Sequence, residues 1–248
     1  MLYTPMRNVF RPLALPRARW PLGPSQCEIC RRWAGARLCA DCLQRFAPPQ
    51  ARCACCALRL GLATPACGEC LRNPPPFELT LCAVDYGFPW DHLITAFKFH
   101  GQTELAAPLS GCMAQALPAV PPCTLVLPVP LATARLATRG YNQAWELARR
   151  VAAAKMLPAR PDVLLRAIDT AHQVELTRAQ RQQNLRAAFY VEPRQRQAVA
   201  GQHVALVDDV MTTGSTVREA SLALLRAGAA AVHVWVLART PEPGAAEH

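Results

Sequence analysis

The stretch His203-Val-Ala-Leu-Val-Asp-Asp-Val-Met-Thr-Thr-Gly-Ser-Thr-Val-Arg-Glu219 has the pattern of a strand, a loop and the start of a helix. Val204 to Val207 form a short apolar run rich in β-branched residues, which is typical of a strand buried on both faces of a parallel sheet. Asp208 and Asp209 follow at the C-terminal end of this strand. The loop from Met211 to Thr216 then supplies one glycine, several hydroxyl groups and a run of backbone N–H groups.

The residues behind this loop have the spacing of an amphipathic helix, with Val217, Ser221 and Leu224 on one face and Gly228 just past its end. A second apolar run, Val232 to Leu237, completes a strand–helix–strand unit. Open α/β sheets bind ligands at the C-terminal ends of their strands, and the N-terminus of a helix attracts anions. An ordinary capped turn would also use Thr, Ser and Gly, but it gives no role to two adjacent carboxylates. The loop is therefore predicted to bind a phosphate group.

Asp208 and Asp209 are suited to accept hydrogen bonds from a vicinal diol and to help hold a divalent cation such as Mg²⁺. The order of four apolar residues, Asp-Asp and Thr-Thr-Gly-Ser-Thr resembles the 5-phosphoribosyl-1-pyrophosphate (PRPP) motif of type I phosphoribosyltransferases. The resemblance implies that both aspartates are catalytic residues that contact the ribose hydroxyls of PRPP or a related sugar phosphate. It further implies that the 5-phosphate is bound by Met211, Thr212, Thr213, Gly214, Ser215 and Thr216.

Four Cys-x-x-Cys knuckles lie between residues 27 and 70, and we expect zinc to be bound by Cys27, Cys30, Cys39, Cys42, Cys53, Cys56, Cys67 and Cys70. Four thiolates form the usual tetrahedral set of a structural zinc site, and metal would supply the folding free energy that a short module lacks. The simplest pairing is sequential, as in a double zinc ribbon, although an interleaved pairing of the first and third knuckles stays open. Cys55 lies inside the third knuckle and is interpreted as a spare cysteine.

The chain of 248 residues has a formal net charge of +10. Two zinc ions on eight thiolates would lower this charge by four to about +6, so the basicity does not by itself indicate a nucleic-acid partner. Prolines interrupt the uncharged stretch from Leu105 to Ala134, which excludes a single membrane-spanning helix there. No signal peptide is evident, and twelve cysteines arranged for metal rather than disulfides favour the reducing cytoplasm.

A second candidate loop follows a predicted strand from Leu125 to Val129 and spans Pro130 to Asn142, ahead of a helix that begins at Gln143. Arg135 and Arg139 precede that helix, so fixed positive charges would meet its positive end and suit a pyrophosphate. Solvated surface arginines are an equally good interpretation from these residues alone.

Several motifs together resemble the ComF family of competence-related proteins. They are the four knuckles, Lys98-Phe-x-Gly101, Pro128-Val-Pro-Leu131, Arg139-Gly-Tyr-Asn-Gln-Ala144 and His172-Gln-x-x-Leu-Thr-Arg-x-x-Arg-x-x-Asn-Leu185. The resemblance covers residues 27 to about 240. It implies a type I phosphoribosyltransferase-like α/β fold, a parallel sheet flanked by helices, with a small N-terminal zinc-ribbon module. It also implies pyrophosphate binding by Arg135, Arg139, Gly140 and Asn142, and a role in moving transforming single-stranded DNA inward with the translocation machinery.

The predicted organisation is a disordered basic leader (1–26), a zinc-ribbon module (27–72), a phosphoribosyltransferase-like domain (77–240) and a disordered tail (241–248). The segment from Arg166 to Phe189 has three interpretations: a mobile hood over PRPP, a surface helix, or part of a path for single-stranded DNA. Its basic residues are Arg178, Arg181 and Arg186. Helices are predicted from Trp90 to Phe99, with Leu93, Ile94 and Phe97 on one face, and from Thr103 to Leu117. Lys98 and His100 are interpreted as solvated rather than as site residues, and Cys82, Cys112 and Cys123 as small core residues. Two functions stay open: a phosphoribosyltransferase with an unknown acceptor, and a non-catalytic adaptor that keeps the pocket as a sensor.

Overall fold

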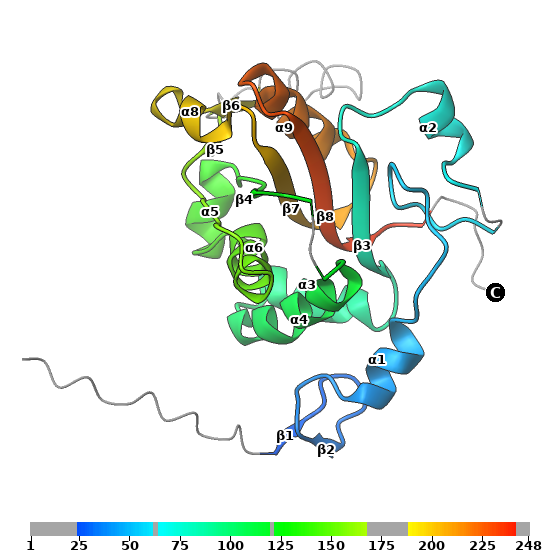
Figure 1. Ribbon diagram of the computed structural model, residues 1–248. Coiled ribbons are helices and arrows are strands. Elements are labelled where there is room, and N and C mark those ends of the chain that lie inside the picture. The colour runs from blue at the N-terminus through cyan, green and yellow to red at the C-terminus, as the bar shows by residue number, and fades with distance from the viewer. Residues whose placement is uncertain (1–23, 62–63, 120–121, 168–187, 242–248) are drawn as a thin grey trace, which may run out of the picture.

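The computed structural model describes residues 24–61, 64–119, 122–167 and 188–241 (Figure 1). The strands are β1 (Ser25–Gln26), β2 (Trp33–Ala34), β3 (Leu79–Asp85), β4 (Leu125–Pro128), β5 (Leu164–Arg166), β6 (Phe189–Val191), β7 (His203–Met211) and β8 (Ala231–Arg239). The helices are α1 (Ala40–Phe46), α2 (Gly68–Arg72), α3 (Trp90–Phe99), α4 (Ala106–Ala116), α5 (Thr133–Arg139), α6 (Gln143–Ala154), α8 (Arg196–Val199) and α9 (Ser215–Arg226), with short 3₁₀ turns η1 (Thr103–Leu105) and η2 (Pro193–Gln195).

A four-stranded parallel sheet in the order β3-β8-β7-β4 forms the centre of the fold. The two central strands are apolar and buried on both faces, as the run at 204–207 predicts. Because all four strands are parallel, their C-terminal ends share one edge of the sheet. The loops that follow β4, β7 and β8 therefore begin close together.

Strand β7 is longer than the sequence predicts. It continues to Met211, so Asp208 and Asp209 lie within the strand rather than behind it. The reason is pairing, because β8 extends to Arg239 and supplies partners for Asp208, Val210 and Met211. The two carboxylates are thus attached to a hydrogen-bonded strand instead of a free loop.

Two layers of helices cover the sheet, and the pleat of β7 separates them. Ala205 and Val207 pack with α3, α4 and α6 in one apolar cluster. Val204 and Leu206 pack with α9 and the β5–β6 pair in the other cluster. Figure 1 shows α3, α4 and α6 gathered on one side of the sheet, with α9 on the other.

Most helices match their predicted positions, with two differences. The helix predicted over 103–117 is a 3₁₀ turn followed by α4, and Pro108 falls in the first turn of α4, where its missing N–H has no role. The predicted loop 130–142 contains α5, which has no buried residue and ends at Gly140 with φ of 80°. Because α5 has no apolar stripe, hydrophobic periodicity cannot detect it.

Two hydrogen bonds show how each half of the cysteine-rich segment is joined to the α/β domain. Trp90 at the start of α3 donates its indole N–H to the carbonyl of Phe46 in α1 at 2.7 Å. Further along, the Thr80 N–H of the edge strand β3 donates to the carbonyl of Ala54 at 2.8 Å. This second contact places Ala54 beside the free edge of β3. No helix in the described ranges is long and apolar enough to cross a bilayer.

Candidate functional site

The loop from Met211 to Thr216, hereafter the phosphate loop, joins the C-terminal end of β7 to α9. Gly214 precedes α9 in the left-handed conformation, with φ of 79°, so the turn favours glycine. A Cβ at Gly214 would also meet Cε of Met211 at 2.6 Å. Thr212 and Thr213 are exposed, and α9 is long enough to present an N-terminal set of free N–H groups. Phosphate binding by this loop stays a prediction.

Asp209 forms a buried ion pair that the sequence analysis missed. Lys98 Nζ, near the end of α3, lies 2.9 Å from Asp209 Oδ2, and the two side chains are 19% and 4% exposed. Asp209 Oδ2 accepts no hydrogen bond of ordinary geometry within the described chain. The short distance between opposite charges still makes this a strong electrostatic contact. Lys98 was interpreted as solvated, and this is corrected; the Lys98-Phe-x-Gly101 motif was the available signal.

The surroundings of Asp208 disfavour its charged form, whereas Asp209 has a positively charged partner. Burial raises the pKa of Asp208 well above its usual value, and the adjacent charge of Asp209 raises it further. The N–H of Asp209, which donates to Asp208 Oδ1 at 2.9 Å, and the charge of Lys98 oppose this effect without cancelling it. A partly buried carboxyl group whose charged form is disfavoured in this way is typical of a functional site. Both aspartates stay predicted ribose and Mg²⁺ contacts.

The residues predicted to bind pyrophosphate are placed on α5 and at the start of α6. Arg139 stacks over the ring of Phe99 at 5.0 Å and donates a hydrogen bond to Gln143. Arg135 is exposed on α5, and Gly140 forms its C-cap. Because Phe99 neighbours Lys98 in α3, Arg139 lies near the aspartate end of the sheet. The pyrophosphate assignment itself stays a prediction.

Asn142 has a local structural role that its predicted assignment did not include. Its side-chain oxygen accepts hydrogen bonds from the N–H groups of Ala144 at 2.9 Å and Trp145 at 3.3 Å, which caps α6. Its amide nitrogen donates to the carbonyl of Val129 at 3.1 Å. Both ends of the amide are engaged, so Asn142 ties the end of β4 to the start of α6.

Replacing Asn142 with Ala should therefore lower the free energy of unfolding by about 1 kcal/mol, because α6 loses its N-cap. Chemical denaturation measures this loss directly. Asn142→Asp keeps the capping oxygen but loses the donor to the Val129 carbonyl, so it serves as the control with a smaller loss of stability than Asn142→Ala. Equal losses in both variants would contradict a capping role.

The predicted hood is described only at its base. Strands β5 and β6 pair antiparallel, with Arg166 opposite Phe189. The arginines at 178, 181 and 186 lie outside the described residues, as do the leader up to residue 23 and the tail from residue 242. The base packs on α9, which carries the phosphate loop at its N-terminus.

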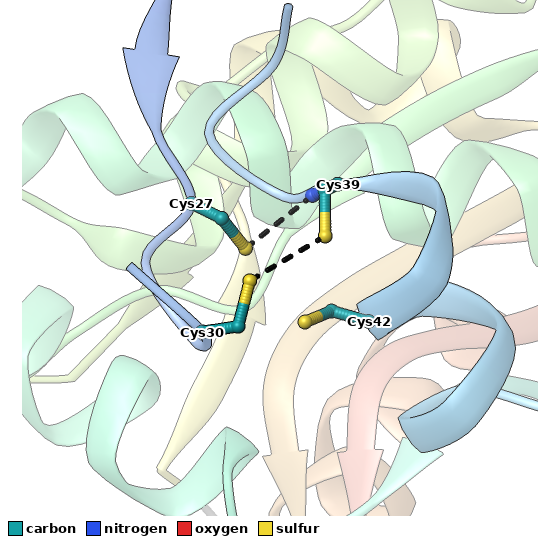
Figure 2. Close-up of side chains that lie close together, drawn as sticks. All are labelled: Cys27, Cys30, Cys39 and Cys42. Atoms are coloured by element: carbon teal, nitrogen blue, oxygen red, sulfur yellow. Dashed lines mark hydrogen bonds between the residues drawn. The ribbon is translucent and has the colours of Figure 1, made fainter. Parts of the chain in front are cut away.

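The eight knuckle cysteines form two separate sets, hereafter the first and second cysteine groups: Cys27, Cys30, Cys39 and Cys42, and Cys53, Cys56, Cys67 and Cys70. Within each group the four sulfur atoms lie within 4.8 Å of one another, which is the arrangement of a tetrahedral zinc site. Figure 2 shows the four side chains of the first group pointing toward one centre. The sequential pairing is confirmed, and the interleaved alternative is excluded.

The two cysteine groups repeat the same local structure. In each, the residue behind the first knuckle, Arg31 or Ala57, has a positive φ and donates its N–H to the carbonyl of the first cysteine, Cys27 or Cys53, at 2.9 and 2.8 Å. A short helix, α1 or α2, carries the fourth cysteine. Cys55 lies outside both groups, as expected, and its carbonyl accepts a hydrogen bond from the hydroxyl of Thr80.

The cysteines of each group differ in their readiness to ionise. Burial raises the pKa of Cys27 most, but backbone N–H donors, mainly from its own group, outweigh it and lower the pKa to about 6. The same balance lowers the pKa of Cys53 to about 7. Burial raises the pKa of Cys42 and Cys70, with further increases from the neighbouring sulfurs. A bound cation would offset this crowding of thiolates.

The remaining core cysteines behave as expected from the sequence. Cys112 and Cys123 are buried, and Cys82 is partly buried against the core. Cys123 Sγ lies 3.3 Å from Nδ1 of His233, whose Nε2 lies 3.0 Å from a carboxylate oxygen of Glu78. Because burial raises the pKa of Cys123 to about 12, this thiol stays protonated and packs as a small core group.

Comparisons with known proteins show what this chain is similar to. A family model described as "Phosphoribosyl transferase domain" matches residues 111–247. The chain is 35% identical over 229 residues to the "DNA utilization protein YhgH" of Escherichia coli K12, covering 88% of this chain and 98% of that protein. It is 32% identical over 208 residues to "Competence protein F" of Haemophilus influenzae, covering 82% and 90%.

Among solved structures, one described as "structure of the allosteric regulatory enzyme of purine biosynthesis" is 25% identical over 53% of this chain. The match covers 25% of that larger chain and has a TM-score of 0.37. A TM-score this low supports no conclusion about function. The family of this chain therefore follows from the family model and the two sequence relatives.

Proposed function

Because this chain belongs to the ComF family of competence-related proteins with a phosphoribosyltransferase domain, we propose that it binds PRPP or a closely related sugar phosphate at the end of β7. The observation that carries the proposal is the buried Asp209–Lys98 pair beside Asp208, directly before the phosphate loop. These groups together offer acceptors for a diol and donors for a phosphate.

Each part of the site has a distinct task in this proposal. The phosphate loop binds the 5-phosphate through its N–H groups and hydroxyls. Asp208 and Asp209 accept hydrogen bonds from the ribose hydroxyls, and Arg135 and Arg139 meet the pyrophosphate. A bound Mg²⁺ ion would neutralise part of the pyrophosphate charge, with the aspartates as its nearest carboxylates.

The reaction proposed for this site is displacement of pyrophosphate from C1 of the ribose. The positive charge that develops on the ring is stabilised by the fixed carboxylates, and exclusion of water strengthens that stabilisation. Lys98 pairs with Asp209 at 2.9 Å and holds it in one orientation, so it acts as a positioning residue for this carboxylate. The acceptor is left open, since no residue at the site identifies it.

The biological setting of the proposal comes from the relatives' names, "DNA utilization protein" and "Competence protein". We place the protein in the reducing cytoplasm, where two groups of four thiols stay available for zinc. There it acts on or beside incoming single-stranded DNA, together with the translocation machinery. The cysteine groups have no open coordination position when zinc is bound, so they serve structure or partner binding rather than catalysis.

The test is a calorimetric titration of the zinc-loaded protein with PRPP and Mg²⁺, followed by an assay for released pyrophosphate with and without single-stranded DNA. We expect binding in the unaltered protein and its loss, by at least about a hundredfold in affinity, in the Asp208→Asn/Asp209→Asn double variant. Arg160, which pairs with Asp162 on the surface, provides a control through Arg160→Gln. Unchanged PRPP affinity in the double variant would remove the site assignment.

Turnover separates the two functions that the sequence leaves open. Binding with release of pyrophosphate identifies an enzyme whose acceptor is to be found. Binding without release identifies a sensor or adaptor that responds to the sugar phosphate. The geometry favours the first outcome, because the carboxylate pair is held on a rigid strand, where catalytic groups are best positioned.

A further inference from the structure

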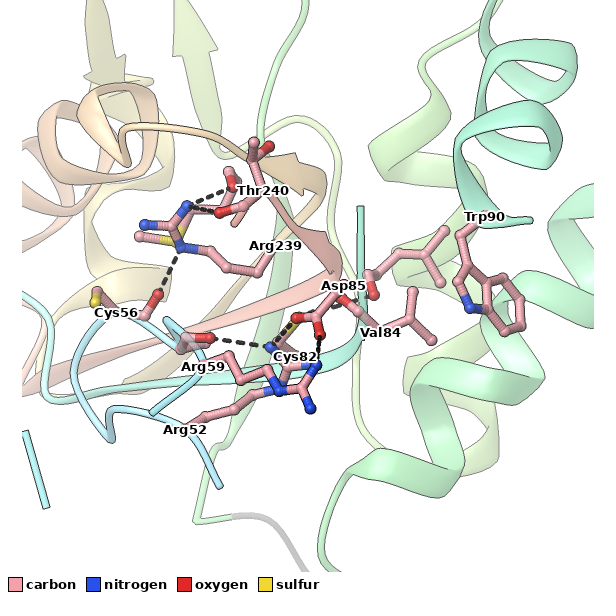
Figure 3. Close-up of polar contacts among 12 residues, drawn as sticks. Arg52, Cys56, Arg59, Cys82, Val84, Asp85, Trp90, Arg239 and Thr240 are labelled. Atoms are coloured by element: carbon pink, nitrogen blue, oxygen red, sulfur yellow. Dashed lines mark hydrogen bonds and ion pairs between the residues drawn. The ribbon is translucent and has the colours of Figure 1, made fainter. Parts of the chain in front are cut away.

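Arg239, the last residue of β8, connects the second cysteine group to the phosphate loop. Its Nε donates a hydrogen bond to the carbonyl of Cys56 at 2.9 Å. Its Nη1 donates to the carbonyls of Met211 at 3.2 Å, of Thr212 and of Thr240. Figure 3 shows the guanidinium of Arg239 between Cys56 and Thr240. One side chain thus contacts a predicted zinc-ligand residue and the first two residues of the loop.

We propose that Arg239 is a positioning residue that holds the phosphate loop in its binding conformation and makes that conformation depend on the second cysteine group. The inference rests on the proposed function for the identity of the ligand. The connection between the two sites rests on the hydrogen bonds alone.

The peptide geometry explains how a cation on one side of the loop prepares the other side. In a trans peptide the carbonyl of one residue and the N–H of the next point in opposite directions. Drawing the carbonyls of Met211 and Thr212 toward Arg239 therefore turns the N–H groups of Thr212 and Thr213 away from it. These are donors that a bound phosphate needs, and they are oriented before the ligand arrives.

The link to metal comes from the position of Cys56. Its carbonyl belongs to the knuckle turn, in which the Ala57 N–H donates to the Cys53 carbonyl at 2.8 Å and Ala57 has φ of 56°. Zinc bound by the second cysteine group would fix this turn and so fix the acceptor for Nε of Arg239. A rigid planar fork is needed to reach both sites, whereas a lysine ammonium is a single point of contact.

Arg52 offers a matched control within the same module. It donates to Asp85 Oδ1 at 2.5 Å and to the Ala57 carbonyl at 3.2 Å, and its side chain is 12% exposed. Arg52 therefore fastens the same knuckle turn to β3 (Figure 3), a turn that zinc bound by the second cysteine group would hold in place without Arg52. Its partners within the described chain, Asp85 and Ala57, lie outside the phosphate loop.

The test compares Arg239→Gln, Arg239→Lys and Arg52→Gln in the full-length, zinc-loaded protein. Hydrogen exchange measured without ligand should rise in the peptides covering residues 211–216 in both Arg239 variants and stay unchanged there in Arg52→Gln. PRPP affinity should fall roughly tenfold in the Arg239 variants and remain within about twofold in Arg52→Gln. By linkage, PRPP should raise the zinc affinity of the unaltered protein, measured by competition with a chelator at equilibrium, and Arg239→Gln should abolish this effect.

Equal loop exchange in Arg239→Gln and the unaltered protein would overturn the proposal, as would equal changes in Arg239→Gln and Arg52→Gln. If Arg239→Lys keeps the loop exchange and PRPP affinity of the unaltered protein, a positive charge alone is sufficient at this position. That result would also overturn the proposal. If the unaltered protein binds no PRPP, the proposed ligand is wrong, while loop exchange without ligand still decides whether Arg239 holds the loop.

Discussion

Replacing Asp208 with Asn is expected to raise the free energy of unfolding by about 1 kcal/mol at neutral pH. The carboxylate of Asp208 is disfavoured in the folded protein by burial and by Asp209, and a neutral amide of nearly the same shape removes both costs. Asp208 retains some exposed surface, so the gain is smaller than for a fully enclosed carboxyl. The expected cost is the function, since an amide cannot replace the proposed contacts to ribose and Mg²⁺.

Replacing Asp209 with Asn should have the opposite effect on stability. The substitution removes the negative partner of Lys98, whose amine is 2.9 Å away. Breaking a fully buried pair costs roughly 3–5 kcal/mol, but the Lys98 side chain can regain some water, so about 2 kcal/mol is expected. Two adjacent and chemically identical substitutions thus change the stability in opposite directions while both weaken ligand binding.

The pH dependence follows from the direction of the Asp208 shift. Because its pKa is raised by folding, the folded state keeps a proton at pH values where the unfolded chain has lost it. The stability contributed by the protonated Asp208 is complete below about pH 4, the unfolded value, and is lost as the pH rises through the folded value. The advantage of Asp208→Asn should therefore be small near pH 4 and grow toward pH 8.

Denaturant titrations of both variants between pH 4 and pH 8 measure these differences. Asp162→Asn is a suitable control, because its exposed pair with Arg160 lies on the surface and contributes little. A loss of stability in Asp208→Asn at pH 8 would show that the Asp208 carboxylate is satisfied in the folded protein. The electrostatic account of the pair would then be wrong.

The parts of the fold that the sequence predicts are those set by local apolar spacing. The helix over Trp90 to Phe99 has the predicted ends, because Leu93, Ile94 and Phe97 form a single buried face. The four knuckles likewise identify the eight cysteines and make the sequential pairing the simplest, but only the structure excludes the interleaved pairing. Local chemistry was sufficient for the helix and for the identity of the cysteines.

The parts that the sequence does not predict depend on partners far along the chain. Lys98 belongs to a family motif, but its ion pair becomes visible only where β7 brings Asp209 against it. Arg239 has no motif at all, and its importance arises only where β8 ends between a knuckle carbonyl and the phosphate loop. Helix α5 has no buried face, so hydrophobic periodicity does not predict it. Long-range polar contacts carry no sequence period, and a structure is needed to find them.

Replacing Cys70 with Ser is expected to reduce the bound zinc from two ions per chain to one and to unfold the second cysteine group. Structural zinc contributes an apparent binding free energy of about 10–16 kcal/mol, which exceeds what so short a segment gains from packing. Elemental analysis gives the zinc content, and limited proteolysis reports the unfolding. Cys55→Ser is the matched control, because Cys55 lies in the same knuckle turn as two ligands but outside both groups.

The two cysteine groups should differ in what their loss does elsewhere in the molecule. Cys42→Ser disturbs the first group, whose helix α1 meets the start of α3 through Phe46 and Trp90, so its effects should concentrate on that helix pair. Cys70→Ser releases the turn that holds Cys56, and with it the guanidinium of Arg239, so the phosphate loop should loosen as well. Hydrogen exchange of residues 211–216 distinguishes the two variants. If both loosen the loop equally, the module acts on the domain as a single block, and the specific path through Arg239 is wrong.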